Sequence, residues 1–169
     1  MPKRKVFYSF YYDRDNWRAS QVRNMGKLEG NAPVSDNDWE EVTNGSDKKI
    51  EKWINDQMFG RSCVVVLAGQ KTANRKWINY ELKQAWAKGK GLVGICIHGL
   101  KDSGGSQDFK GSNPFADVTV TKADGSKEKL SNIFKLKSGP YTASTSIYNH
   151  IKDNIEDWIE EAIEIRNKY

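Results

Sequence analysis

Two apolar runs of strand length, separated by one amphipathic helix, constrain the fold of this chain most. The runs are SCVVVLAG (62–69) and GLVGICIHG (91–99), and both are nearly continuous, as is typical of strands covered on both faces of a sheet. Between them, residues 74–86 carry apolar side chains at helical spacing, and the helix ends near Lys88–Gly89, a favourable pair for a helix end. A strand, a helix and a strand in this order predict parallel pairing with a right-handed crossover.

Further elements of the same kind flank this unit. KRKVFYSFYY (3–12) is rich in aromatic and β-branched residues and predicts a first strand. Helices are predicted from Asp15 to about Leu28, from Ser46 or Asp47 onward, and over 144–166, where the apolar residues follow a helical period. The sequence therefore predicts an α/β fold with an open, mostly parallel sheet and helices on both faces.

The remaining segments are rich in turn-forming residues. Residues 30–46 predict a loop with a short strand near 33–34, and residues 101–140 predict an irregular region with a small hairpin around 123–125. No internal repeat and no linker divides the chain, so we expect one domain over residues 1–169.

Composition and charge exclude several classes of function. Lys and Arg number 27 against 22 Asp and Glu, a net charge of +5, and no long basic run or basic stripe with interleaved aromatics suggests a nucleic-acid partner. We expect Cys63 and Cys96, within the two apolar runs, to be buried free thiols, and His98 and His150 lack the spacing of a metal pair. No signal peptide and no run of about 20 apolar residues occurs, so we expect a soluble cytoplasmic protein.

Glu81 is an ionisable residue on the apolar face of the helix over 74–86. At about 100° per residue it falls between Trp77 and Ala85, so its carboxylate points toward the interior or a cleft in it. One interpretation is a boundary residue whose methylenes pack while its carboxylate meets a Lys or Arg. The other is a positioned charge close to the carboxyl ends of the strands, where ligands bind in such sheets. A carboxylate there can stabilise a developing cation or bind sugar hydroxyls.

The segment SFYYDRD (9–15) is a second candidate, because it follows the first predicted strand at the same edge. Phe10, Tyr11 and Tyr12 are able to stack on a flat ring, while Ser9 and Asp13 are able to bond a ribose. The alternative is that Phe10 and Tyr12 alternate into the core. Residues 30–46 and the AGQKTANRKW segment (68–77) form the other loops at this edge.

Residues 5 to about 116 resemble the TIR-like proteins of bacterial Thoeris anti-phage systems. The most specific part is an apolar strand ending in glycine, a polar loop with Thr72, then RKW (75–77) and YEL (80–82). This order parallels the Ser/Thr-loop-Trp-x-x-x-Glu-Leu signature of TIR domains, and the first strand resembles their hFhSh opening, where h is apolar. Residues 117–169 match the family less clearly.

The resemblance implies a flavodoxin-like TIR fold and an enzyme that uses NAD as its substrate, with no separate cofactor and no metal. Such enzymes cleave the nicotinamide–ribose bond, and Thoeris TIR proteins form a cyclised or otherwise modified ADP-ribose messenger that activates a separate effector. Glu81 matches the catalytic glutamate of the family. The predicted substrate-binding residues are Ser9, Phe10, Tyr11, Tyr12, Asp13, Asp36, Trp39 and Trp77.

Two positions depart from the family pattern. Ile78 follows Trp77 where animal and plant TIR domains often have Cys, and Tyr11 stands where some Thoeris relatives have His. Because Tyr11 borders the proposed pocket, its identity bears on product specificity.

Two other functions are compatible with the same residues. One is a non-catalytic TIR-like interaction module, in which Trp39 and Glu40 contact a partner. The other is a hydrolase resembling nucleoside deoxyribosyltransferases, which uses the same glutamate on free nucleosides. A homo-oligomer and a phage-derived trigger are further partners that the resemblance suggests, while it leaves the product linkage, the trigger and the effector open.

Overall fold

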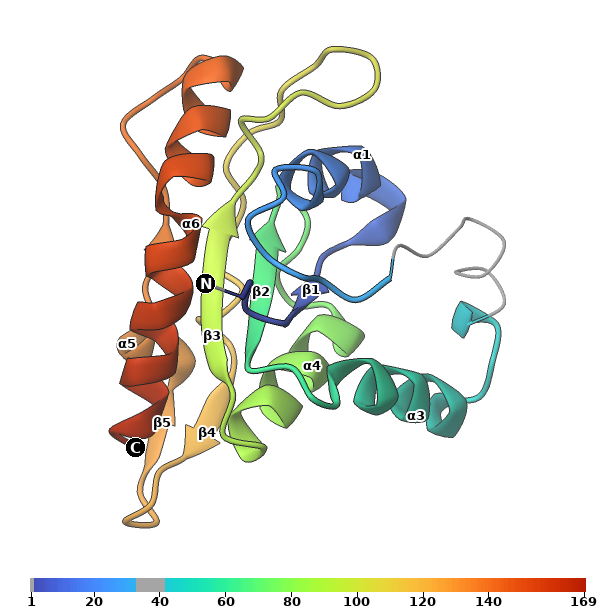
Figure 1. The fold of residues 1–169 in the computed structure, drawn as a ribbon. Helices are drawn as coiled ribbons and strands as arrows, with labels where there is room; N and C mark the ends of the chain where they lie inside the picture. Colours follow the sequence, from blue (N-terminus) through green and yellow to red (C-terminus); the bar gives the residue numbers. More distant parts are fainter. Residues whose placement is uncertain (1, 33–41) are drawn as a thin grey trace.

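A four-stranded parallel sheet in the order β1-β2-β3-β6 runs through the centre of the molecule (Figure 1). The computed structural model describes residues 2–32 and 42–169. The strands are β1 (Val6–Ser9), β2 (Cys63–Ala68), β3 (Gly91–Cys96) and β6 (Leu136–Lys137). Every residue of the first three is buried, which explains why their sequences are continuous apolar runs rather than alternating ones.

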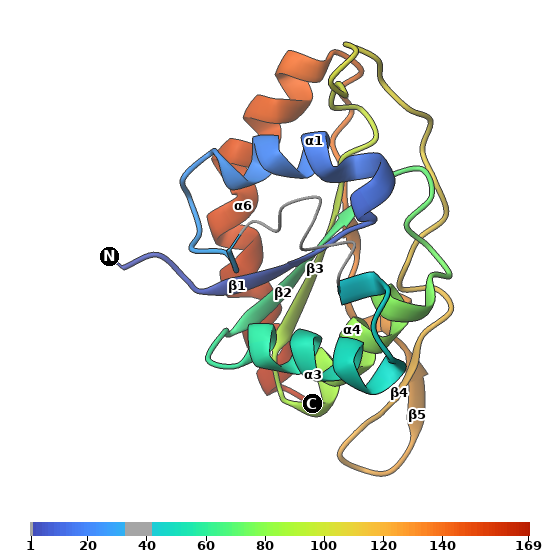
Figure 2. The ribbon, with the colours of Figure 1, turned by 90° about the vertical axis from the view of Figure 1, so that its right-hand side faces the viewer.

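Helices cover both faces of this sheet (Figure 2). Helices α1 (Tyr12–Arg23) and α6 (Ser144–Asn167) lie on one face, and α3 (Asp47–Met58) and α4 (Lys76–Ala87) lie on the other. Helix α4 connects β2 to the parallel strand β3, so the predicted strand–helix–strand unit and the predicted α/β class are confirmed.

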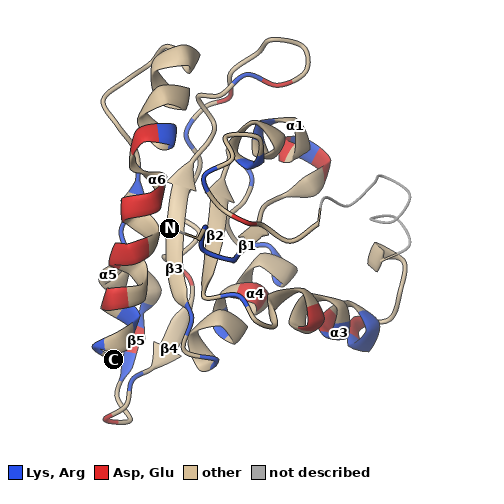
Figure 3. Ribbon diagram, viewed as in Figure 1, with Lys and Arg blue, Asp and Glu red and all other residues tan. Residues whose placement is uncertain are grey.

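Helix α6 is amphipathic as its sequence predicts. One side is buried against the sheet through Ile151, Ile155, Ile159 and Ala162. Its acidic residues lie on the exposed side, where red marks them in Figure 3, and Glu160 pairs there with Arg4 at 2.7 Å. No helix among the described residues is long and apolar enough to cross a bilayer.

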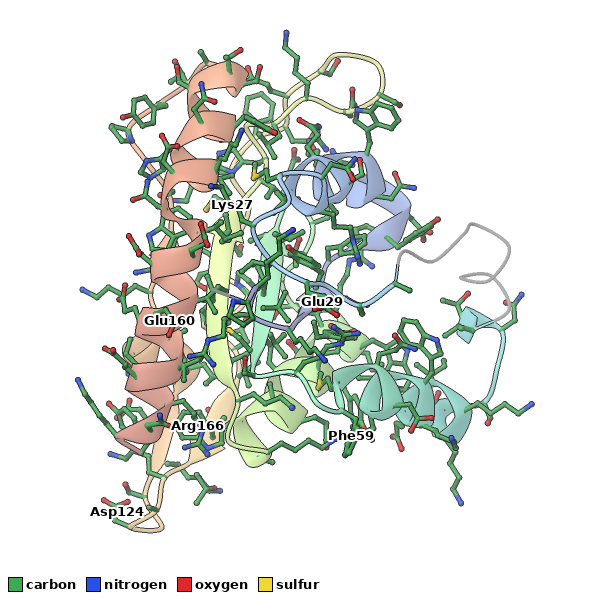
Figure 4. The ribbon with its side chains drawn as sticks, viewed as in Figure 1. Lys27, Glu29, Phe59, Asp124, Glu160 and Arg166 are labelled. Carbon is green, nitrogen blue, oxygen red and sulfur yellow. The ribbon has the colours of Figure 1, made fainter. Side chains whose placement is uncertain are left out.

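The end of α6 also contacts the end of α4. Arg166, which Figure 4 labels, packs over the Trp86 ring with its guanidinium carbon 4.0 Å from the ring centroid. It also donates a 2.8 Å hydrogen bond to the Trp86 carbonyl. This contact helps to hold the last helix beside the helix that carries Glu81.

The boundary between the first strand and the first helix differs from the prediction. The strand predicted over 3–12 ends at Ser9, and the helix predicted from Asp15 begins at Tyr12 and ends at Arg23. Asp13 and Asp15 fall in the first turn of α1, where negative charge is favourable, and this supports the earlier start. Tyr12 is therefore a helix residue rather than a strand residue.

The irregular region predicted over 101–140 contributes to the core. Strands β4 (Thr119–Thr121) and β5 (Lys127–Lys129) form the predicted antiparallel hairpin, with Gly125 at a φ of +85° in its turn. Phe115 and the short helix α5 (Leu130–Ile133) belong to the same hydrophobic cluster as β2 and β3. The strand predicted near 33–34 lies outside the described residues.

Candidate functional site

A cleft of about 1150 Å³ opens at the carboxyl ends of β1 and β2. Residues directly after β1 and residues of the loop between β2 and α4 form much of its wall. The lining side chains come from Phe10, Tyr11, Tyr12, Asp13, Asn16, Thr43, Gln70, Lys71, Ala73, Asn74, Arg75, Lys76, Trp77, Ile78, Glu81 and Ser112. A cleft of this size at the carboxyl edge of a parallel sheet is a typical ligand-binding position.

Glu81 lies in the second turn of α4 and is only 7% exposed, although it lines the cleft. The helix presents it to the interior because Ile78, Leu82 and Ala85 anchor the same face in the core. Burial raises the pKa of the Glu81 carboxyl to about 8, and a hydrogen bond from the Ser9 hydroxyl to Oε2 opposes part of that rise. No Lys or Arg among the described residues pairs with this carboxylate, so the boundary ion pair considered above is not seen there.

A second, smaller hollow of about 310 Å³ also reaches Glu81. Its lining is mostly aromatic and includes Phe7, Tyr8, Trp17 and Trp53, together with Arg23. Four residues line both cavities: Phe10, Tyr12, Asn16 and Glu81. The carboxylate therefore lies where two differently lined spaces meet.

The structure brings most of the predicted site residues together. Beside Glu81, the cleft is lined by the predicted residues Phe10, Tyr11, Tyr12, Asp13 and Trp77. The half-buried rings of Phe10 and Tyr12 lie 6.2 Å apart, and Phe10 also packs against the hydrophobic core. Asp36 and Trp39, like Glu40, lie outside the described residues.

Ser9, predicted to bond a ribose, is buried at the end of β1. Its side chain is only 1% exposed and lines neither of these cavities, because it ends the fully buried strand β1. Its hydroxyl donates to the Glu81 carboxylate instead. The Ser9 hydroxyl is therefore placed to orient the carboxylate, and its predicted contact with a ribose stays a prediction.

Several residues that line the cleft were not predicted from the sequence. Lys71 and Arg75 lie in the loop after β2, which the sequence places at this edge of the sheet, so their position along the chain was the available signal. Ser112 had no such signal, because it comes from a distant segment. That segment packs on the same loop: the Phe109 amide donates to Gln70 Oε1 at 3.1 Å.

A buried charge network joins α1 to residues 100–108. Arg18 is 1% exposed and donates to the Leu100 carbonyl at 2.8 Å, to Asp15 at 3.1 Å and to Asp108 at 3.0 Å. Burial raises the pKa of Asp15, and the hydrogen bond from Arg18 opposes that rise. In the part of the chain that the structure describes, no three His, Cys, Asp or Glu side chains form a metal-binding group.

Comparison with known proteins matches the region that builds this site. The family model described as "Thoeris protein ThsB, TIR-like domain" matches residues 7–102, which include both strand ends and Glu81. A protein of Bacillus cereus (strain MSX-D12) named "Putative cyclic ADP-D-ribose synthase ThsB1" is 38% identical over 117 residues, or 66% of this chain. The match spans 61% of that relative's own length. The chain belongs to the family of Thoeris ThsB proteins with a TIR-like domain.

Proposed function

We propose that this protein is an NAD-consuming signalling enzyme that cleaves the bond between nicotinamide and ribose. The observation that carries the proposal is the buried Glu81 carboxyl, positioned where a cleft of about 1150 Å³ meets an aromatic hollow. A substrate with two parts joined at a scissile bond suits such a pair of spaces. The printed name of the Bacillus cereus relative, a cyclic ADP-D-ribose synthase, supports the same class of reaction.

Glu81 acts electrostatically in this proposal. As nicotinamide leaves as a neutral molecule, positive charge develops on the ribose, and a fixed carboxylate beside it lowers the energy of that transition state. The low dielectric of a buried site strengthens the interaction. In the free protein the raised pKa of about 8 keeps much of the carboxyl neutral at pH 7, and the cationic nicotinamide ring of bound NAD favours ionisation.

Enclosure of the reacting centre determines the fate of the ribosyl cation. If the cleft excludes water once NAD is bound, a nucleophile within the substrate competes with hydrolysis. The product is then a cyclised or otherwise modified ADP-ribose, which activates a separate effector protein in the Thoeris response.

The test compares the NAD consumption of Glu81→Gln with that of the wild type. Mass spectrometry then compares the small molecules in phage-infected cells that carry each protein. We expect Glu81→Gln to lose the activity because the neutral amide cannot stabilise the developing charge, while its folding is retained. Glu164→Gln, at an exposed position on α6, is the matched control and keeps wild-type turnover. Undiminished NAD loss by folded Glu81→Gln rejects the proposal.

A further inference from the structure

We propose that Arg75 and Lys71 form a subsite for the diphosphate of the dinucleotide at the outer wall of the cleft. The inference rests on the proposed function, because it assigns one part of NAD to one part of the same site. Among the described residues that line the cleft, the cationic ones are Lys71, Arg75 and Lys76. All three belong to one wall, formed by the loop after β2 and the start of α4.

Arg75 is held in place with its binding groups available. Its guanidinium carbon lies 3.2 Å from the centroid of the Tyr11 ring, so the two planar groups are in contact. Its Nε donates a 2.8 Å hydrogen bond to the Lys71 carbonyl. Within the described residues, the two terminal nitrogens have no hydrogen-bond partner. A fixed guanidinium with two available amino groups matches the oxygens of a phosphate.

The charges around Arg75 favour an anion at this wall. Lys71 adds an exposed cation beside the half-buried Arg75, whereas Lys76 is already paired with Asp47 at 2.6 Å. The acidic residues among the described lining are Asp13 and Glu81, and the latter is buried behind the wall. Helix α4 begins here without a side-chain cap and without an acidic residue in its first turn, so its dipole adds to the positive potential.

The spacing along α4 suits the order of groups in NAD. Glu81 follows Arg75 by six positions, a rise of about 9 Å along the helix axis. In NAD, one ribose ring separates the nicotinamide–ribose bond from the diphosphate. The diphosphate of a substrate whose scissile bond lies beside Glu81 is therefore able to reach the start of α4.

The experiment measures cleavage of a phosphate-containing and a phosphate-free substrate by the same variants. For Arg75→Met we expect the KM for NAD to rise about 10- to 100-fold, the loss typical of one charge-assisted hydrogen-bonding group. Cleavage of nicotinamide riboside, which has no phosphate, changes less than about 3-fold. Lys83→Met removes one positive charge from the exposed side of the same helix and leaves both substrates unaffected. Equal losses on NAD and on nicotinamide riboside overturn the subsite.

Direct titration with ADP separates this inference from the proposed function, since ADP carries the diphosphate without a bond to cleave. We expect ADP to bind the wild type and Lys83→Met equally, and Arg75→Met and Lys71→Met at least about 10-fold more weakly. Lys71 is exposed, so Lys71→Met carries the test if Arg75→Met fails to fold. Unchanged ADP affinity in these variants overturns the subsite even if NAD is consumed. The expected losses of affinity in a protein that consumes no NAD even in phage-infected cells support the subsite and reject the activity.

Discussion

At the scale of single residues, Glu81 imposes a pH dependence on folding. Its pKa rises from 4.5 to about 8 on burial, so between these values the folded protein holds a proton that the unfolded chain has released. Stability therefore falls as pH rises through this window, by up to about 1.4 kcal/mol per pH unit. Glu81→Gln has no ionisable carboxyl at this position. We therefore expect its free energy of unfolding in urea to exceed that of the wild type by an amount that grows from pH 5 to pH 8. A constant difference between the two proteins contradicts this account.

The Ser9 hydroxyl affects the pH at which Glu81 ionises. Its hydrogen bond lowers the pKa of Glu81, so Ser9→Ala leaves the pKa higher than in the wild type. We expect the rising limb of kcat/KM against pH to move to higher pH, while the plateau at high pH changes little. Ser126→Ala, at the exposed hairpin turn, serves as the control and keeps the wild-type profile. A uniform loss at every pH points instead to a general structural defect.

At the scale of elements, the buried cation Arg18 joins α1 to residues 100–108. Arg18→Met leaves Asp15, itself 0% exposed, without its charged partner, and breaking a buried pair costs about 3–5 kcal/mol. Arg14→Met removes a more exposed ion pair with the same Asp108, and we expect its free energy of unfolding to fall by less than about 1 kcal/mol. Equilibrium urea unfolding of both variants measures the contrast. Equal losses of unfolding free energy in the two variants show that burial does not determine how much an ion pair of this network contributes to stability.

The elements differ in how far the sequence predicts them. Strands β2 and β3 and helix α4 follow from local patterns, because apolarity and the helical period are set by neighbouring residues. The same period places Glu81 on the inward face of α4. The first strand was predicted to extend to residue 12, because Phe10, Tyr11 and Tyr12 have high strand propensity. In the structure β1 ends at Ser9 and helix α1 begins at Tyr12.

Contacts between distant segments were beyond reach of the sequence pattern. Arg18 and Asp108 are 90 positions apart, and no local period relates them. Ser112 reaches the cleft because its segment packs on the loop after β2, where a Cβ on Gly111 would lie 2.4 Å from the Gln70 carbonyl oxygen. The sequence pattern places Ser9 at the end of its strand but does not give the depth of its burial.

At the scale of the whole molecule, ligand binding separates an enzyme from a module that acts by assembly alone. A ligand that binds only the folded state stabilises it by about 2.7 kcal/mol at 100 times its Kd. We expect NAD to raise the Tm of Glu81→Gln, which binds without turnover. Concentration-dependent oligomers with no effect of NAD favour the interaction module. A substrate panel that shows cleavage of free nucleosides but not of NAD favours the deoxyribosyltransferase-like hydrolase.

The most direct measurement is a crystal structure of Glu81→Gln in complex with NAD. We expect the nicotinamide–ribose bond to lie beside the residue 81 side chain, with the two ends of the dinucleotide extending into the two spaces that meet there. NAD bound away from residue 81, or a residue 81 side chain turned out to solvent in the complex, contradicts this expectation.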